Sequence, residues 1–437
     1  MNYERVLHAG IDNSTRILYF LIKGGNMKNL RNLSRFILTM LTMMVCTSVL
    51  YANPATSGNP VTVNRNSGFN ALRSPALMSW QEDDTSGIGY IYSLQVYEDI
   101  EGTINNGTEI PVYADSKSIF KGTGLFSCVL RSGDHSFGIG IRNTDEAQFA
   151  LSESSQEFTL GMYSMHNEEK KKIINLSSVL SYSYRIGSKH ALGIQGETGY
   201  GVTTIDKTTE EFVSGAVTTS SNNTQTDSTS ASLAAGYSFI SKPFEAGIMI
   251  RGGEFSKVTI NRSGENGGMA INDVETGPDY FQNKGFGITG GIAFRPDYRM
   301  LVNMEAGIDF PYKYGKKSIN DSNNVVDDDV HSSGVYMFRT GADYRVNRNL
   351  SAGIGASYAF SSSSTDSSDG RSTEMNLNLF EFTSGIEYRF MNGIDLLVAC
   401  NFLYISADMG MENPGMEIDL GFDTLSVNFV TGISTAF

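Results

Sequence analysis

The segment from Leu350 to Phe360 reads LSAGIGASYAF, and its alternation decides the fold. Leu, Ala, Ile, Tyr and Phe occupy every second position, whereas Ser, Gly and Ala stand between them. Side chains of a β-strand point alternately to the two faces of its sheet, so this strand has one apolar face and one small, polar face. The segment from Met300 to Tyr312 repeats the pattern, with Glu305 and Asp309 on the polar face.

The predicted strands are too long for a soluble sheet. They run for roughly 11–17 residues, whereas strands of globular proteins usually have about five or six. A transmembrane barrel needs such lengths and turns apolar side chains toward lipid and polar ones toward the lumen. After residue 52, no apolar run approaches the roughly 20 residues of a membrane helix. The sequence therefore predicts an all-β, transmembrane antiparallel β-barrel.

The spacing of the turns predicts the number of strands. Six short connections are expected near 132–133, 187–188, 241–243, 295–297, 347–348 and 391–393. Two strands flank each of them, one strand near 86–97 precedes them and one near 423–437 follows, which gives about 14 strands in a barrel spanning 86–437. Seven long polar connections are expected near 98–117, 145–172, 206–226, 262–277, 314–330, 362–374 and 408–422. A hairpin within 145–172 would raise the number to about 16.

The start of the chain predicts export. Residues 27–52 read as a signal peptide, with a basic start followed by an apolar stretch that ends at Ala52. We expect the natural chain to begin at Met27, so that residues 1–26 are a leader that does not belong to the protein. Residues 1–52 hold six basic and two acidic residues, which leaves 27 Lys and Arg against 45 Asp and Glu. This acidity excludes a nucleic-acid partner and fits the outer membrane of a diderm bacterium.

Residues 53–85 precede the first strand and contain a short apolar stretch. Solvated tails are poor in large apolar side chains, because such side chains gain free energy only when they are buried. We therefore expect this segment to fold into the barrel as a plug. The plug residues predicted from the sequence are Phe69, Leu72, Pro75, Leu77 and Trp80.

Charged residues fall in the lumen-facing phase of the predicted strands. A Lys or Arg on the lipid side costs about 2–4 kcal/mol at the midplane, which favours this segregation in any barrel. Positively and negatively charged side chains both occur in this phase, which indicates paired charges across the wall or charges that anchor a plug. The predicted lumen-facing charges are Arg142, Glu305, Asp309, Arg339, Asp343, Glu387 and Arg389.

No pattern in the chain predicts catalysis, a metal site or a cofactor. The histidines are scattered over different turns, strands and loops, and no GxSxG nucleophile motif occurs. Cys128 and Cys400 share the phase of apolar neighbours, so both are expected to face lipid. The sequence therefore predicts a protein that is not an enzyme.

Several features together resemble the FadL-type outer-membrane transporters of long-chain fatty acids and other hydrophobic compounds. These are the signal peptide, the segment GFNALRSPA at 68–76, the predicted strands and the terminal Phe437. A terminal Phe that closes an amphipathic strand resembles the signal read by the barrel assembly machinery. The resemblance implies passive uptake of hydrophobic small molecules, and we expect the protein to act as a monomer in outer-membrane lipid.

Two other functions stay open at this point. The long loops of such a barrel could bind a host or neighbouring molecule at the cell surface. The chain could also form a narrow general porin, although residues 53–85 would help to fill its lumen. The position of residues 53–85 distinguishes the plugged transporter from the open porin.

Overall fold

A computed structural model describes residues 70–72, 74–81, 83–105, 109–115, 120–145, 154–160, 163–213, 216–252, 255–266, 269–276, 280–283, 286–319, 325–368, 370–390, 394–413 and 416–436. The predictions for 1–26, 27–52, Phe69 and Phe437 lie outside these residues. Within the described part of the chain, no helix is long and apolar enough to cross a membrane.

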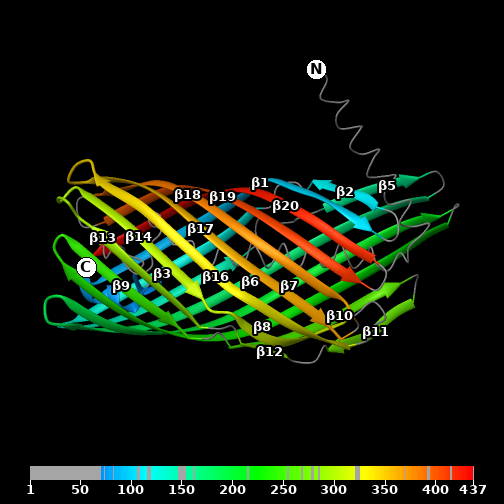
Figure 1. The fold of residues 1–437 in the computed structure, drawn as a ribbon, viewed down its shortest axis with the longest axis horizontal. Coiled ribbons are helices and arrows are strands. Elements are labelled where there is room, and N and C mark those ends of the chain that lie inside the picture. The colour runs from blue at the N-terminus through cyan, green and yellow to red at the C-terminus, as the bar shows by residue number, and fades with distance from the viewer. Residues whose placement is uncertain are drawn as a thin grey trace, which may run out of the picture.

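The strands form one closed antiparallel barrel (Figure 1). Each strand hydrogen-bonds to its neighbours in chain order, and the first strand pairs with the last along nearly its whole length, from Thr85 opposite Ala436 to Asn105 opposite Glu417. This pairing leaves no free edge at the seam, as a membrane requires. Because several barrel strands are interrupted, the 20 strand segments make up 14 strands across the wall. The predicted fold and strand number are confirmed.

The barrel strands follow one another directly in the chain. Two short 3-10 helices, η1 and η2, precede the first strand. The elements are η1 (Asn70–Leu72), η2 (Pro75–Trp80), β1 (Thr85–Asn105), β2 (Glu109–Asp115), β3 (Phe120–Ser132), β4 (His135–Asp145), β5 (Ser154–Leu160), β6 (Tyr163–Ile186), β7 (His190–Val213), β8 (Ala216–Ser241), β9 (Phe244–Arg251), β10 (Phe255–Asn266), β11 (Met269–Thr276), β12 (Tyr280–Asn283), β13 (Gly287–Phe294), β14 (Met300–Asp309), β15 (Tyr312–Ile319), β16 (Val325–Arg345), β17 (Leu350–Ser367), β18 (Ser372–Arg389), β19 (Ile394–Asn413) and β20 (Met416–Ala436).

The two ends of the barrel differ. The C-terminus lies at the end that carries the short turns, which is the periplasmic end in barrels of this class (Figure 1). At the other end, the predicted long loops are wrong for most of their length, because the strands continue through them. Residues 206–226, for example, belong mainly to β7 and β8, which stay paired as far as Val213 and Ala216. The hairpin in 145–172 is β5 paired with β6, and it extends existing wall strands without adding to their number.

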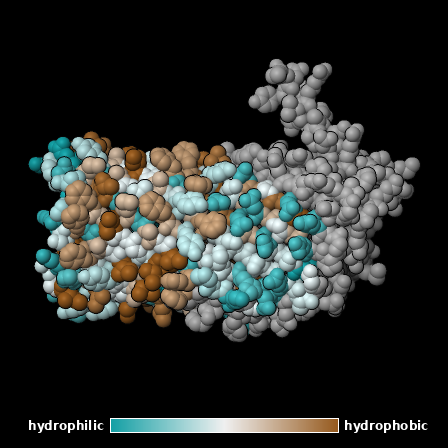
Figure 2. All heavy atoms as spheres, in the orientation of Figure 1, coloured by the Kyte–Doolittle hydropathy of each residue, from teal (hydrophilic) through white to brown (hydrophobic). Residues whose placement is uncertain are grey.

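The outer surface has an apolar band near the periplasmic end and a polar zone beyond it (Figure 2). On β19 the outward-facing side chains are apolar from Ile394 to Tyr404. These ten steps cover about 33 Å along the strand, or about 25 Å across the membrane at a tilt of about 40°. That height matches the hydrocarbon core that outer-membrane barrels span, so the band places the protein in the bacterial outer membrane.

Aromatic rings collect at the periplasmic edge of this band. Phe244 and Phe294 pack with ring centroids 5.1 Å apart, and Tyr388 and Phe390 with centroids 4.8 Å apart. Rings at this depth lie between hydrocarbon and water, which suits their amphipathic edges. Cys128 and Cys400, both free thiols, share the outward phase of the band.

Beyond the band, toward the external end, polar and apolar side chains still alternate along the strand, but the outward face is now polar and the inward face apolar. Outward-facing Asp408 and Glu412 of β19 are charged, whereas inward-facing Met409 and Met411 are apolar and buried. The register with β20 runs through this change without a shift. The strand therefore leaves the membrane near Tyr404, and from there polar side chains face water.

The membrane boundary on β19 gives a testable prediction. Val398→Arg puts a cation on the lipid face within the band and should lower the free energy of unfolding in lipid vesicles by about 2–4 kcal/mol. Asp408→Arg places the same side chain on the same face of the same strand, above the band, and should change it by less than about 0.5 kcal/mol. Denaturant titration of both variants measures the difference, and equal losses would contradict this placement of the membrane.

Candidate functional site

The segment 70–81 folds back against the inner wall of the barrel. Pro75 begins η2, where its missing N–H group costs nothing, and Ser74 precedes it in extended conformation. The amide of Leu77 donates to the carbonyl of Ser74 at 3.1 Å, which closes the first turn. Every residue of η2 is buried, and Leu77 and Met78 are among the most buried side chains of the described residues.

The wall that receives this segment is made of small side chains. An added Cβ at Gly193 of β7 would come 2.6 Å from the backbone carbon of Pro75. Gly138 and Gly140 of β4 lie in the same way against Met78 and Leu72. Glycine leaves room for the backbone of the segment at Gly193 and for its side chains at Gly138 and Gly140, so the interior of β4 to β8 is shaped to the segment.

Wall side chains also hydrogen-bond to the segment. The indole Nε1 of Trp80 donates to the hydroxyl of Ser238 at 2.6 Å, and the hydroxyl of Ser79 donates to that of Ser183 at 2.7 Å. The guanidinium of Arg142 donates to the carbonyl of Leu72 at 2.9 Å. These bonds satisfy polar groups that would otherwise be buried without partners.

The opposite part of the wall carries ion pairs on its inner face. Arg339 Nη1 of β16 lies 2.6 Å from Glu305 Oε1 of β14, and both side chains are buried. Arg251 pairs with Asp309 at 2.6 Å, which ties β9 to the end of β14. Pairs of opposite sign within one wall neutralise each other, so this face presents hydrogen-bonding groups with little net charge.

The remaining predicted charges lie nearer the periplasmic rim. Arg389 is exposed and pairs with Asp395 across the turn between β18 and β19, at 2.7 Å. Glu387 and Asp343 are half-buried on the inner phase of β18 and β16. The geometry therefore separates these three residues from the buried pair of Glu305 and Arg339.

A second region of the interior lies just above the segment. Leu72 packs in one apolar cluster with Ala399 of β19 and Val430 of β20, which fixes the inward phase of both strands. One step toward the external end, Asn401 stands opposite Asn428, and both are buried. Asn401 Nδ2 donates to Glu381 Oε1 of β18 at 3.1 Å, and Ser357 Oγ of β17 donates to the other carboxylate oxygen at 3.0 Å. Asn401, Asn428, Glu381 and Ser357 form what we call the polar shelf.

Buried apolar side chains follow the polar shelf toward the external end. The inner stripe consists of Leu403, Ile405, Ala407, Met409 and Met411 of β19 with Ile418, Leu420 and Phe422 of β20. This stripe corrects the prediction from the sequence, in which 408–422 formed a loop and apolar side chains faced lipid. The signal was present in the unbroken alternation of Leu403 to Met411, next to outward-facing Asp408 and Glu412.

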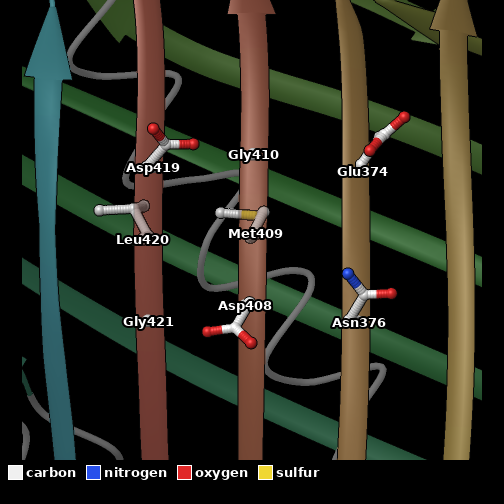
Figure 3. A pocket seen from close by; sticks show the side chains of 8 residues that line it. All are labelled: Glu374, Asn376, Asp408, Met409, Gly410, Asp419, Leu420 and Gly421. Atoms are coloured by element: carbon white, nitrogen blue, oxygen red, sulfur yellow. The ribbon is translucent and has the colours of Figure 1, made fainter.

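A depression on the outer face of the same strands carries carboxylates. Glu374, Asp408 and Asp419 line it from β18, β19 and β20, together with Asn376 (Figure 3). Within the described residues, no three His, Cys, Asp or Glu side chains are grouped closely enough to hold a metal ion.

The barrel has the fold of known outer-membrane channels. The toluene transporter TodX of Pseudomonas putida superimposes with a TM-score of 0.54 at 14% identity, covering 87% of this chain and 96% of TodX. A FadL homologue of Pseudomonas aeruginosa superimposes with a TM-score of 0.54 at 11% identity, covering 88% of this chain and all of the homologue. No protein-family model and no curated protein matches the sequence.

The class of protein follows from these observations: the chain is an outer-membrane β-barrel with the fold of the FadL-type channels. The β-barrel fold that the resemblance to FadL-type transporters implied is thus confirmed by solved structures that share little sequence with this chain. At such low identity the similarity defines the fold, and the interior residues of this chain have to carry the argument for function.

The close packing at Gly193 predicts a sharp effect of one methyl group. Gly193→Ala should dislodge the segment, because the new Cβ meets the backbone of Pro75, which cannot rotate away. We expect higher single-channel conductance in planar bilayers. Gly196→Ala is the matched control on β7, since its Cβ has nothing nearer than 3.7 Å. Unchanged conductance in Gly193→Ala would contradict this packing.

The buried ion pair predicts a mutant cycle. Arg339→Leu leaves the buried carboxylate of Glu305 without its partner and should cost about 3–5 kcal/mol of unfolding free energy. The double variant Glu305→Leu with Arg339→Leu removes both charges and should recover most of that loss. Denaturant titration measures both, and a double variant as unstable as the single one would contradict the ion pair.

Proposed function

We propose that this barrel takes up hydrophobic small molecules passively across the outer membrane, and that residues 70–81 act as a plug against water and ions. The observation that carries the proposal is the inner stripe, because a wall that only conducts ions or water has no use for eight buried apolar side chains facing inward. A solute enters from the external end, moves along the stripe and meets the plug below it. No covalent chemistry is needed, and the protein is proposed to be neither an enzyme nor dependent on a cofactor.

The related folds support a hydrophobic solute. TodX is a toluene transporter, and a variant of it is described as a monoaromatic hydrocarbon channel. Long-chain fatty acids are the finer assignment that the FadL-type resemblance suggests for this chain. The inner stripe is compatible with either, since the hydrophobic effect is not directional and apolar side chains can bury rings and alkyl chains alike.

The plug role rests on contacts of the segment with five strands. Its backbone and side chains are held by β3, β4, β6, β7 and β8, through the serines and glycines described above and through Arg131, whose guanidinium donates to the carbonyl of Gln81 at 2.6 Å. Each bond is modest, about 0.5–1.5 kcal/mol net, so the segment can shift without unfolding the barrel. We propose that Phe69, Leu72, Pro75, Leu77 and Trp80 form the apolar body of this plug.

Assembly is proposed to follow the usual route for such barrels. The C-terminal strand, β20, is expected to be read by the barrel assembly machinery through its terminal Phe437, and the chain is expected to act as a monomer surrounded by lipid.

Uptake and conductance together test the proposed function. Cells that lack their own hydrophobic-compound channels should take up labelled toluene or a labelled long-chain fatty acid faster when they express this protein. The intact barrel should conduct little, and deletion of residues 64–80 should raise its conductance, because the plug no longer blocks water. Large steady conductance from the intact protein would identify a general porin. Absence of uptake, with no change on deletion, would point to a surface-binding protein.

A further inference from the structure

The polar shelf contains a hydrogen-bond acceptor that no described residue satisfies. The side chain of Asn401 is 1% exposed, and its Oδ1 has no hydrogen-bond partner among the described residues. The amide is oriented with Nδ2 toward Glu381, since a carboxylate accepts hydrogen bonds from an NH2 group. A buried acceptor without a donor costs about 1–3 kcal/mol, so this oxygen is a place where a donor from a solute gains free energy.

Asn401 lies on the proposed path of the solute, between the inner stripe and the plug. Directly below it, Ala399 belongs to the apolar cluster that also contains the plug residue Leu72. Directly above it, Leu403 begins the inner stripe, which reaches Met411 after about 26 Å along the strand. A solute that descends the stripe therefore brings its leading end to Asn401 at the point where the plug stops it.

The charges around the polar shelf decide which leading group fits. Glu381 places a carboxylate beside Asn401, and β19 and β20 contain no Lys or Arg. Arg339 of β16 binds Glu305 at 2.6 Å and also acts electrostatically on Glu381, so its single positive charge already faces two carboxylates. An anionic head group would bring a second negative charge and no donor, whereas a neutral hydroxyl brings a proton for Oδ1 and no charge.

We propose that the polar shelf binds the hydroxyl group of a neutral amphiphile, an alcohol or phenol, whose apolar part lies along the inner stripe. The hydroxyl donates to Oδ1 of Asn401 next to Glu381. The inference rests on the proposed uptake function and adds a preference to it: among solutes with the same apolar part, the alcohol is favoured over the carboxylate.

Three labelled probes with one alkyl chain test this preference. Dodecanol, dodecanoate and dodecane differ only at the end that reaches the polar shelf. Uptake is measured at low concentration in cells without other hydrophobic-compound channels, with background from cells lacking the protein subtracted. The unmodified protein should take up dodecanol faster than dodecanoate. Asn401→Leu, which keeps the side-chain volume, should slow dodecanol about fivefold and leave dodecane unchanged.

Two variants complete the experiment. Asn376→Leu makes the same exchange on the outer face of β18 and should leave all three rates unchanged (Figure 3). Glu381→Gln removes the negative charge and should narrow the difference between dodecanol and dodecanoate. Heat-modifiable migration of each variant in gels verifies that the barrel has formed.

The outcomes separate the two proposals. If the unmodified protein takes up none of the probes, the uptake function itself fails. If it takes up dodecane but Asn401→Leu leaves the ratio of dodecanol to dodecane unchanged, the polar shelf holds only water and the inference is overturned. Faster uptake of dodecanoate than of dodecanol by the unmodified protein would overturn it as well.

Discussion

The pairing of β1 with β20 is the constraint on which the rest of this structure depends. Within a bilayer no water is available for a backbone N–H or C=O group, so an open sheet edge would leave a row of unsatisfied groups in hydrocarbon. Twenty residue pairs close that edge here. Once the sheet is closed, every strand has one face toward lipid or water and one face toward the lumen. Whether a position suits a polar or an apolar side chain then depends on its face and on its position along the barrel axis.

The interior then divides into levels along the barrel axis. Residues 70–81 lie lowest, against glycines and serines of β4 to β8. The polar shelf with Asn401 and Glu381 follows, and the inner stripe lies above it. The wall across from residues 70–81 carries ion pairs such as that of Glu305 with Arg339, in which the two opposite charges neutralise each other. From the external end inward, the interior is therefore first apolar, along the inner stripe, and then polar, at the polar shelf. This order suits the proposed solute, which is mostly hydrocarbon and carries one polar end.

The fit between residues 70–81 and the wall explains why small residues stand where a membrane barrel could equally carry larger polar ones. Interior positions of a narrow barrel are normally filled by side chains. In this barrel, Gly193 and Gly236 leave room for the backbone of Pro75 and Ala76. The space is therefore filled by a separate segment of the chain, and a segment held by a few hydrogen bonds can move where a wall residue cannot.

The sequence by itself determined the barrel, because a period of two, regular turns and the absence of long apolar runs leave a membrane β-barrel as the consistent fold. It also determined which residues of a strand share a face: alternation alone puts Glu305 with Asp309, and Cys400 with Val398 and Phe402. Only the tertiary structure decided how far the strands continue, since polar strands such as 216–227 resemble loops until their pairing partner is known. It likewise decided that Met409 and Leu420 face inward while Asp408 and Asp419 face out. The physical reason is that alternation defines two faces without saying which solvent each one meets, and that depends on closure of the sheet and the height of the membrane around it.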